Sequence, residues 1–309
     1  MALFEKLRKG IIHEIESQGG RHAEPALYAE PLGDPGLIGP GSISWEIHGD
    51  LASLLIGGPA AILMEVLHPS VMAGVFTQSS YRTDPFRRAR NTLGYVLRTT
   101  FCSTRAATRV IEQVKGVHAR IKGTRADGVE YHALDPELIG WVHTAIPWAV
   151  MRAFETYNRP LSRAEKDRYL REQAPIGRMG GADYVPESVS ELEDYLLQMR
   201  PKLAMTQQFQ EFLDFLSGQT DDFPQSARER RERWVGVHAS MALLPEWAQR
   251  LTGTYQSKAL REGLLFPADR LKARLVRWSY PELPCKTMAL ERARAAPTPN
   301  SDLAERDHA

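Results

Sequence analysis

The sequence predicts a single all-α domain. Apolar residues recur at helical spacing along most of the chain, whereas the alternation typical of strands is almost absent. Hydrophobic residues make up 43% and charged residues 25% of the 309 residues, which is the balance of an ordinary globular chain. No repeat or clear linker divides the chain, so we expect one domain over residues 1–288, with its core at about 40–200, and a disordered tail over 289–309.

The elements begin with a helix expected from Leu3 to Gln18, followed by a glycine- and proline-rich loop that reaches Gly41. Ser42 or Ser44 is expected to cap the next helix, because a serine hydroxyl accepts a hydrogen bond from the first helical turn. Pro59 is expected to open another helix at its first position.

The middle of the chain carries further start and stop signals. Asp84–Pro85 predicts a basic helix that continues through Arg98. Ser103 or Thr104 is expected to cap the following helix, and Gly123 is expected to end it.

A hairpin and several more helices complete the prediction. Asp127–Gly128 is a turn signal for a small hairpin, and Asp135–Pro136 starts the apolar helix PELIGWVHTAIPWAVMRAFETYN. Ser162 and Glu165 form a capping box for a helix that is expected to end near Ala174. Later helices are expected from Ser188 or Ser190, and within residues 206–216, 224–241 and 257–278.

Charge and cysteine content exclude several classes of function. The net charge of +1 gives no general attraction for nucleic acid, and the basic stretch ARERRERW interleaves glutamates in the pattern of a solvated helix face. Cys102 and Cys285 fit no metal or disulfide framework, so we expect a reduced, cytoplasmic protein. The apolar run over 51–64 is too short to span a bilayer, although peripheral membrane contact stays open.

Common catalytic motifs are absent from the sequence. The segments GGPAA and GRMGG lack the lysine–serine ending and the preceding strand of a phosphate-binding loop. No HExxH, CxxC or GxSxG motif appears, so nothing supports zinc hydrolysis, thioredoxin chemistry or an α/β-hydrolase nucleophile.

His143 is the most unusual of the nine histidines. On a helix it projects from an apolar stripe with Ile139, Ile146 and Val150, and no carboxylate lies three or four residues away. Pro147 offers no N–H to the carbonyl of His143, so we expect the helix to kink or loosen there. A neutral imidazole in such surroundings suits the axial position of haem, and it equally suits a core histidine bonded to a backbone carbonyl.

The helix before His143 has a second unusual face. Arg109, Glu112, Gln113 and Gly116 share one side of it. Because glycine inside a helix costs about 1 kcal/mol relative to alanine, Gly116 suggests the close approach of another helix or of a planar ligand. The alternative is that Arg109 and Glu112 form an ordinary solvent-facing pair.

Three segments in order resemble one enzyme family. They are LHPSVMAGVFTQSSYRTDPFRRARNTL, VKGVHARIKG and YHALDPELIGWVHTAI, and the likeness covers about residues 40–200. The family is that of the mycophenolic-acid pathway oxygenase MpaB and the bacterial latex-clearing proteins. The resemblance implies an all-α fold with a globin-like core around one haem b. It also implies a reaction in which dioxygen cleaves a carbon–carbon double bond of an isoprenoid-like, apolar small molecule.

The resemblance assigns roles to several residues. The proximal ligand of the haem iron falls on His143, and the arginine needed around the haem falls on Arg109. Glu112 and Gln113 stand where the latex-clearing proteins have lysine and threonine, so rubber is not implied as the substrate. Glu112 is a candidate catalytic base if it is desolvated, and otherwise forms a salt bridge with Arg109 or Lys115.

Two other histidines are candidates for cofactor contact. His68 matches a His–Pro pair of the family, for which packing and contact with a haem propionate are both open, and His118 has the same two alternatives. Three functions follow: a haem-dependent oxygenase, a haem protein that binds oxygen without oxidising a substrate, and a cofactor-free helical binding protein. The sequence does not indicate the oligomeric state.

Overall fold

The computed structural model describes residues 5–6, 8–13, 25–78, 85–220 and 226–295. Its helices and strands are α2 (Ala26–Ala29), α3 (Ile43–His48), α4 (Leu51–Glu65), α5 (Pro69–Gln78), α6 (Pro85–Phe101), α7 (Thr104–His118), β1 (Lys122–Thr124), β2 (Glu130–His132), α8 (Pro136–Tyr157), α9 (Arg163–Gly180), α10 (Val189–Met199), the 3₁₀ turn η1 (Arg200–Lys202), α11 (Gln207–Leu216), α12 (Ala227–Leu243), α13 (Glu246–Leu251), α14 (Lys258–Leu260), the π-helical turn η2 (Arg261–Leu265), α15 (Phe266–Ser279) and α16 (Pro284–Arg294). Residues 5–6 and 8–13 of the expected first helix are also helical. The all-α prediction is confirmed.

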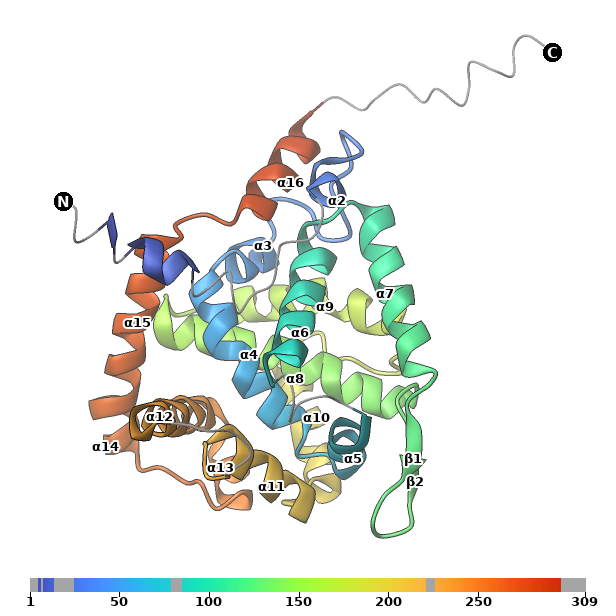
Figure 1. The fold of residues 1–309 in the computed structure, drawn as a ribbon. Coiled ribbons are helices and arrows are strands. Elements are labelled where there is room, and N and C mark those ends of the chain that lie inside the picture. The colour runs from blue at the N-terminus through green and yellow to red at the C-terminus, as the bar shows by residue number, and fades with distance from the viewer. Residues whose placement is uncertain (1–4, 7, 14–24, 79–84, 221–225, 296–309) are drawn as a thin grey trace.

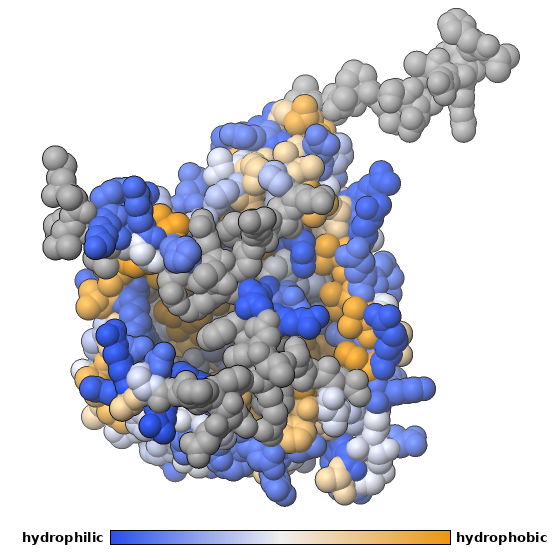
Figure 2. Space-filling view, viewed as in Figure 1, coloured by the Kyte–Doolittle hydropathy of each residue, from blue (hydrophilic) through white to orange (hydrophobic). Residues whose placement is uncertain are grey.

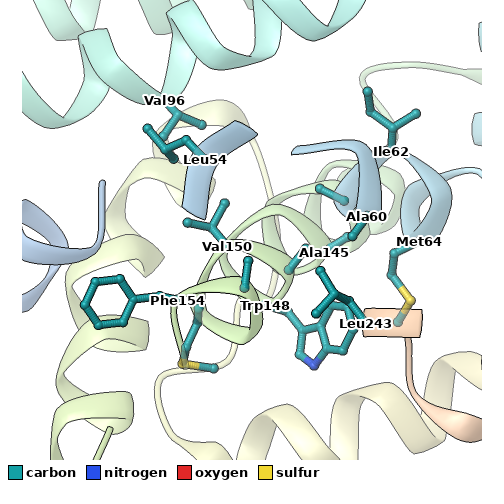
Figure 3. Close-up of a cluster of buried hydrophobic side chains, with 14 of the residues drawn as sticks. Leu54, Ala60, Ile62, Met64, Val96, Ala145, Trp148, Val150, Phe154 and Leu243 are labelled. Atoms are coloured by element: carbon teal, nitrogen blue, oxygen red, sulfur yellow. The ribbon is translucent and has the colours of Figure 1, made fainter. Parts of the chain in front are cut away.

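The core forms around α4 and α8, which cross the centre of the molecule (Figure 1). Helix α4 has Gly57 at the crossing, where a Cβ would lie 3.0 Å from the Cα of Val150 on α8. This small residue lets the two backbones approach closely, and apolar side chains fill the rest of the interface. Figure 3 shows Leu54 and Ala60 of α4 beside Val150 and Ala145 of α8.

The other elements surround this pair. Figure 1 shows α7 along one side, α15 along the opposite side, and α11, α12 and α13 together below. The antiparallel hairpin β1–β2 pairs Gly123 with Tyr131 and turns through Gly128, whose φ is 85°. The hairpin prediction at Asp127–Gly128 is therefore confirmed.

Most of the expected caps lie at helix starts. The hydroxyl of Ser42 accepts from the N–H of Trp45 at 3.1 Å, and the carboxylate of Asp135 accepts from that of Glu137. The Ser162 capping box is present, and Ser188 also caps its helix. Each cap acts within three residues, so local sequence is enough to place it.

One start differs from the prediction. Ser103 holds the N-cap position of α7 but makes no side-chain cap bond. The carboxylate of Asp34, from the amino-terminal arm, accepts instead from the N–H and the hydroxyl of Thr104. Asp84 lies outside the described residues, whereas Pro85 begins α6 as expected.

Two predicted helix boundaries at prolines are wrong. Pro59 does not open a helix but lies inside α4, and α9 continues through Pro175 to Gly180 instead of ending near Ala174. In both cases the helix is anchored by buried residues on each side of the proline, and this packing offsets the missing backbone hydrogen bond. Helix α8 likewise runs without a break through Pro147.

Two further boundaries are also wrong. Helix α7 ends at His118, because Gly123 is paired in the hairpin. The expected disordered tail begins too early, since α16 reaches Arg294 with Ala289 and Arg292 fully buried. Residues 296–309 lie outside the described part of the chain.

Candidate functional site

His143 lies in the middle of α8 and faces α9. Two glycines of α9 pack against its imidazole: a Cβ at Gly177 would lie 3.1 Å from the Cβ of His143, and one at Gly180 would lie 3.0 Å from Nε2. The ring of Tyr95, on α6, meets the imidazole edge to face with 5.9 Å between centroids. Any larger residue at 177 or 180 would displace the ring, so the glycines determine where it sits.

The ring nitrogens of His143 have no hydrogen-bond partner within the part of the chain that the structure describes. Burial, and to a smaller extent the nearby His118, lower the pKa of His143 to about 4. The imidazole is therefore neutral at pH 7, which is the state that binds a metal ion. Beside it on α8, the buried hydroxyl of Thr144 also lacks a partner among the described residues.

The imidazole of His48 is bound by the fold at both nitrogens. The hydroxyl of Thr100 donates to the carbonyl of Val96, so it accepts from Nδ1 of His48 at 2.7 Å. The hydroxyl of Tyr169 then donates to Nε2 at 2.8 Å. His48 is therefore a satisfied core histidine.

His68 is intermediate between His143 and His48 in its hydrogen bonding. It is buried at the turn between α4 and α5, and burial lowers its pKa to about 4. Its Nδ1 accepts from the N–H of Ser70 at 3.2 Å, so one nitrogen is committed to the turn.

A cavity of about 160 Å³ opens beside His143. It is formed by α5, the end of α7, β2 and α8, and its lining is mostly apolar. The lining residues are Ser70, Val71, Gly74, Val75, His118, Ile121, Tyr131, Ala133, Leu138, Ile139, Val142 and His143. Two of the predicted site residues, His118 and His143, therefore line the same cavity. His68 does not line it, but its Nδ1 accepts a hydrogen bond from Ser70, which does.

Comparison with protein families matches residues 45–278 to the catalytic domain described as "ER-bound oxygenase mpaB/B'/Rubber oxygenase". The chain belongs to this oxygenase family. The match spans most of the chain and confirms the resemblance seen in the three sequence segments. Comparisons with curated proteins and with solved structures found no match.

The other site residues expected in this mpaB/rubber-oxygenase domain lie apart from the cavity. Arg109, Glu112 and Gly116 are exposed on α7, and none of them lines the cavity. The carboxylate of Glu112 is 60% exposed and pairs with Lys115 at 3.1 Å, so it is not desolvated. A Cβ at Gly116 would meet nothing within 4 Å, so no described element approaches it closely.

Sequence reasoning missed the residues that position His143. The sequence drew attention to Gly177 and Gly180 only within the segment GRMGG, which lacks the features of a phosphate-binding loop. Their spacing of three places them on one face of a helix, but the helix was expected to stop near Ala174. Tyr95 comes from a distant helix and carries no local signal.

The residues at His143 fit a haem ligand in their chemistry. Haem iron takes one neutral imidazole, and His143 offers one with both nitrogens free of hydrogen bonds among the described residues. Gly180 packs closely beside Nε2, since a Cβ at this position would lie only 3.0 Å from it. The cavity itself is smaller than the roughly 300–1,000 Å³ of cofactor sites, so we do not assign haem to it.

Other kinds of site find less support. Among the described residues, no group of three or more His, Cys, Asp or Glu side chains is placed to hold a metal ion. No single described helix is long and apolar enough to cross a bilayer; α4 and α5 reach that length and composition only as a pair bent by 109°.

Proposed function

We propose that this family member is a haem b-dependent oxygenase that acts with dioxygen on a small apolar, isoprenoid-like molecule and cleaves a carbon–carbon double bond. The observation that carries the proposal is the His143 imidazole, which is neutral and forms no hydrogen bond with any described residue. His143 lines the cavity beside it, where its imidazole can meet a ligand.

His143 would hold the haem iron through a nitrogen of its imidazole. When bound, haem supplies the redox chemistry with dioxygen that no side chain of the protein provides. Gly177 and Gly180 keep the imidazole in one orientation, and the edge of Tyr95 closes another side of the ring. Because the imidazole is already neutral, no proton has to leave before it ligates the metal.

The apolar lining beside His143 supports an apolar substrate. Leu138, Ile139 and Val142 line the cavity with apolar side chains. A charged molecule that entered would lose its hydration, and these side chains would not compensate for the loss. The polar residues of the lining are Ser70, His118, Tyr131 and His143. We assign His118, together with His68, to the surroundings of the cofactor.

The α7 residues have weaker support. Arg109 is proposed to contact a haem propionate or to donate to the oxygen, and it is exposed enough to turn toward either. The exposed Lys115 pair argues against Glu112 as the base. Gly116 would have to adjoin the cofactor itself, since no described side chain is near it.

The test is an absorption spectrum of protein produced with a supply of haem, compared with His143→Ala. We expect a strong Soret band that is lost or displaced in the folded variant. His132→Ala is the matched control, because His132 is exposed on β2 and should leave the band unchanged. A folded, colourless parent that takes up no added haem would contradict the proposal.

Turnover is tested separately. We expect oxygen consumption with an alkene of the isoprenoid type and carbonyl-containing products. A haem band without oxygen consumption across a range of alkenes would indicate a haem protein that binds oxygen and does not oxidise a substrate.

A further inference from the structure

An exposed apolar stripe runs along α14, η2 and α15. We call it the leucine stripe and define it as Leu260, Leu264, Leu271, Leu275 and Trp278. Leu264 and Leu271 are 61% and 60% exposed, which is unusual for side chains of this size. Figure 2 shows apolar side chains at the margin of the molecule where Figure 1 draws α15.

Helical geometry places three of these side chains on one face. Leu271, Leu275 and Trp278 are spaced by four and three residues on α15, and Leu260 and Leu264, in α14 and η2 directly before it, are exposed as well. The opposite face packs into the protein through Phe266, Ala273 and the buried Asp269. The helix is thus anchored on one side, and the stripe is an outer surface.

Positive charge surrounds the stripe. Residues 258–279 contain six basic and two acidic residues, although the whole chain has a net charge of only +1. Asp269 and Arg277 face the protein, where Asp269 is buried and Arg277 binds Asp50 at 2.7 Å. The other basic residues are Lys258, Arg261, Arg270, Lys272 and Arg274. Lys258 pairs with the exposed Glu262, Lys272 with Asp269, and Arg270 donates to the carbonyl of Thr156, so Arg261 and Arg274 carry the charge that the pairs do not offset.

We propose that the leucine stripe docks this protein on the surface of a bilayer that contains anionic lipids. An apolar face rimmed by Lys and Arg, with a Trp at one end, is the pattern of helices that lie in the membrane interface. Leucines enter the acyl boundary while the basic side chains reach the headgroups.

A second copy of the chain is a poorer occupant. A twofold contact through the stripe would place the same basic residues opposite each other, and like charges in an interface repel. An anionic bilayer instead complements both the apolar and the basic parts of this surface. The inference does not depend on haem, although a bilayer is where the proposed apolar substrate would collect.

The experiment is co-sedimentation of the full chain with vesicles. One set is pure phosphatidylcholine and the other an equal mixture of phosphatidylcholine and phosphatidylglycerol. We expect binding to the mixed vesicles that weakens with added salt, and much less binding to the neutral ones. Leu264→Ser with Leu271→Ser should lower the partition coefficient about tenfold or more, since two apolar side chains leave the acyl boundary.

Two controls separate this surface from general stickiness. Leu197→Ser removes a leucine that is 59% exposed on α10, outside the stripe, and should bind as the parent does. Arg274→Glu should weaken binding to mixed vesicles alone. Circular dichroism shows whether each variant keeps its helix content.

Three outcomes would overturn the proposal. The first is a parent that stays in the supernatant with mixed vesicles. The second is an equal loss of binding in Leu197→Ser and in the stripe variant. The third is a dimer in the absence of lipid that Leu271→Ser dissociates, which would assign the stripe to a second copy instead.

Discussion

His48, on α3, and His143, on α8, are two histidines with different hydrogen bonding in the fold. The ring of His48 is fixed by Thr100 and Tyr169 at both nitrogens, whereas among the described residues the ring of His143 packs against two glycines and Tyr95 and lines a cavity. Burial lowers the pKa of both, to about 3 and about 4, so the pKa alone does not distinguish them. The difference lies in the partners: one imidazole stabilises the fold, and the other is available to a ligand.

The largest effect on stability is expected from substitution of His48. His48→Ala would leave the fully buried hydroxyl of Tyr169 without its partner and open a cavity. We expect the free energy of unfolding to fall by about 3 kcal/mol, measured by denaturant titration. The same substitution at His143 should cost much less. Equal losses at both positions would mean that His143 is a structural histidine too.

Acid titration sharpens the comparison. The pKa of His48 is about 3 in the fold and about 6.5 in an unfolded chain, so the unfolded state binds more protons between these values. Stability should therefore fall as the pH drops below 6.5, by about 1.4 kcal/mol per pH unit from this group. Unfolding of the parent and of His48→Gln at several pH values measures the difference in slope. Parallel slopes would show that His48 does not titrate as described.

Gly180→Ala tests whether the space beside His143 matters. The new methyl would lie 3.0 Å from Nε2 and would push the imidazole by a few tenths of an ångström. We expect haem affinity to weaken about tenfold and the Soret band to shift. Gly236→Ala on α12 is the matched control, because a Cβ there meets nothing within 4 Å. An unchanged haem titration for Gly180→Ala would separate His143 from the cofactor.

Gly116→Ala has the smallest expected effect. Gly116 is an exposed helical residue with open space around its Cβ position, so alanine should stabilise the protein by about 0.5–1 kcal/mol. The haem spectrum should not change. A changed spectrum would indicate that Gly116 adjoins the cofactor.

The helix starts were predictable because their causes are local. Ser42, Asp135 and Ser162 each satisfy an N–H within three residues, and such bonds follow from the sequence alone. Helix ends were less predictable. Pro59 and Pro175 are tolerated because packing from distant residues holds their helices together, and no local signal contains that information.

The site also has features that the sequence predicts and features that depend on tertiary packing. The apolar face around His143 was visible from its spacing, and the family resemblance singled out the same residue. The contact with Gly177 and Gly180 depends on how α9 crosses α8, which periodicity does not specify. The meeting of His118 with His143 at one cavity likewise depends on the hairpin and α5.

The buried guanidinium of Arg292 has a consequence for biosynthesis. It donates to the carbonyls of Tyr28, Asp34, Phe101 and Cys102, which precede it by as many as 264 residues. At translation rates of about 5–20 residues per second, roughly 13–53 s separate synthesis of Tyr28 from that of Arg292. Until Arg292 is made, these carbonyls lack its guanidinium, and the bonds from Thr104 to Asp34 can already hold the amino-terminal arm to α7.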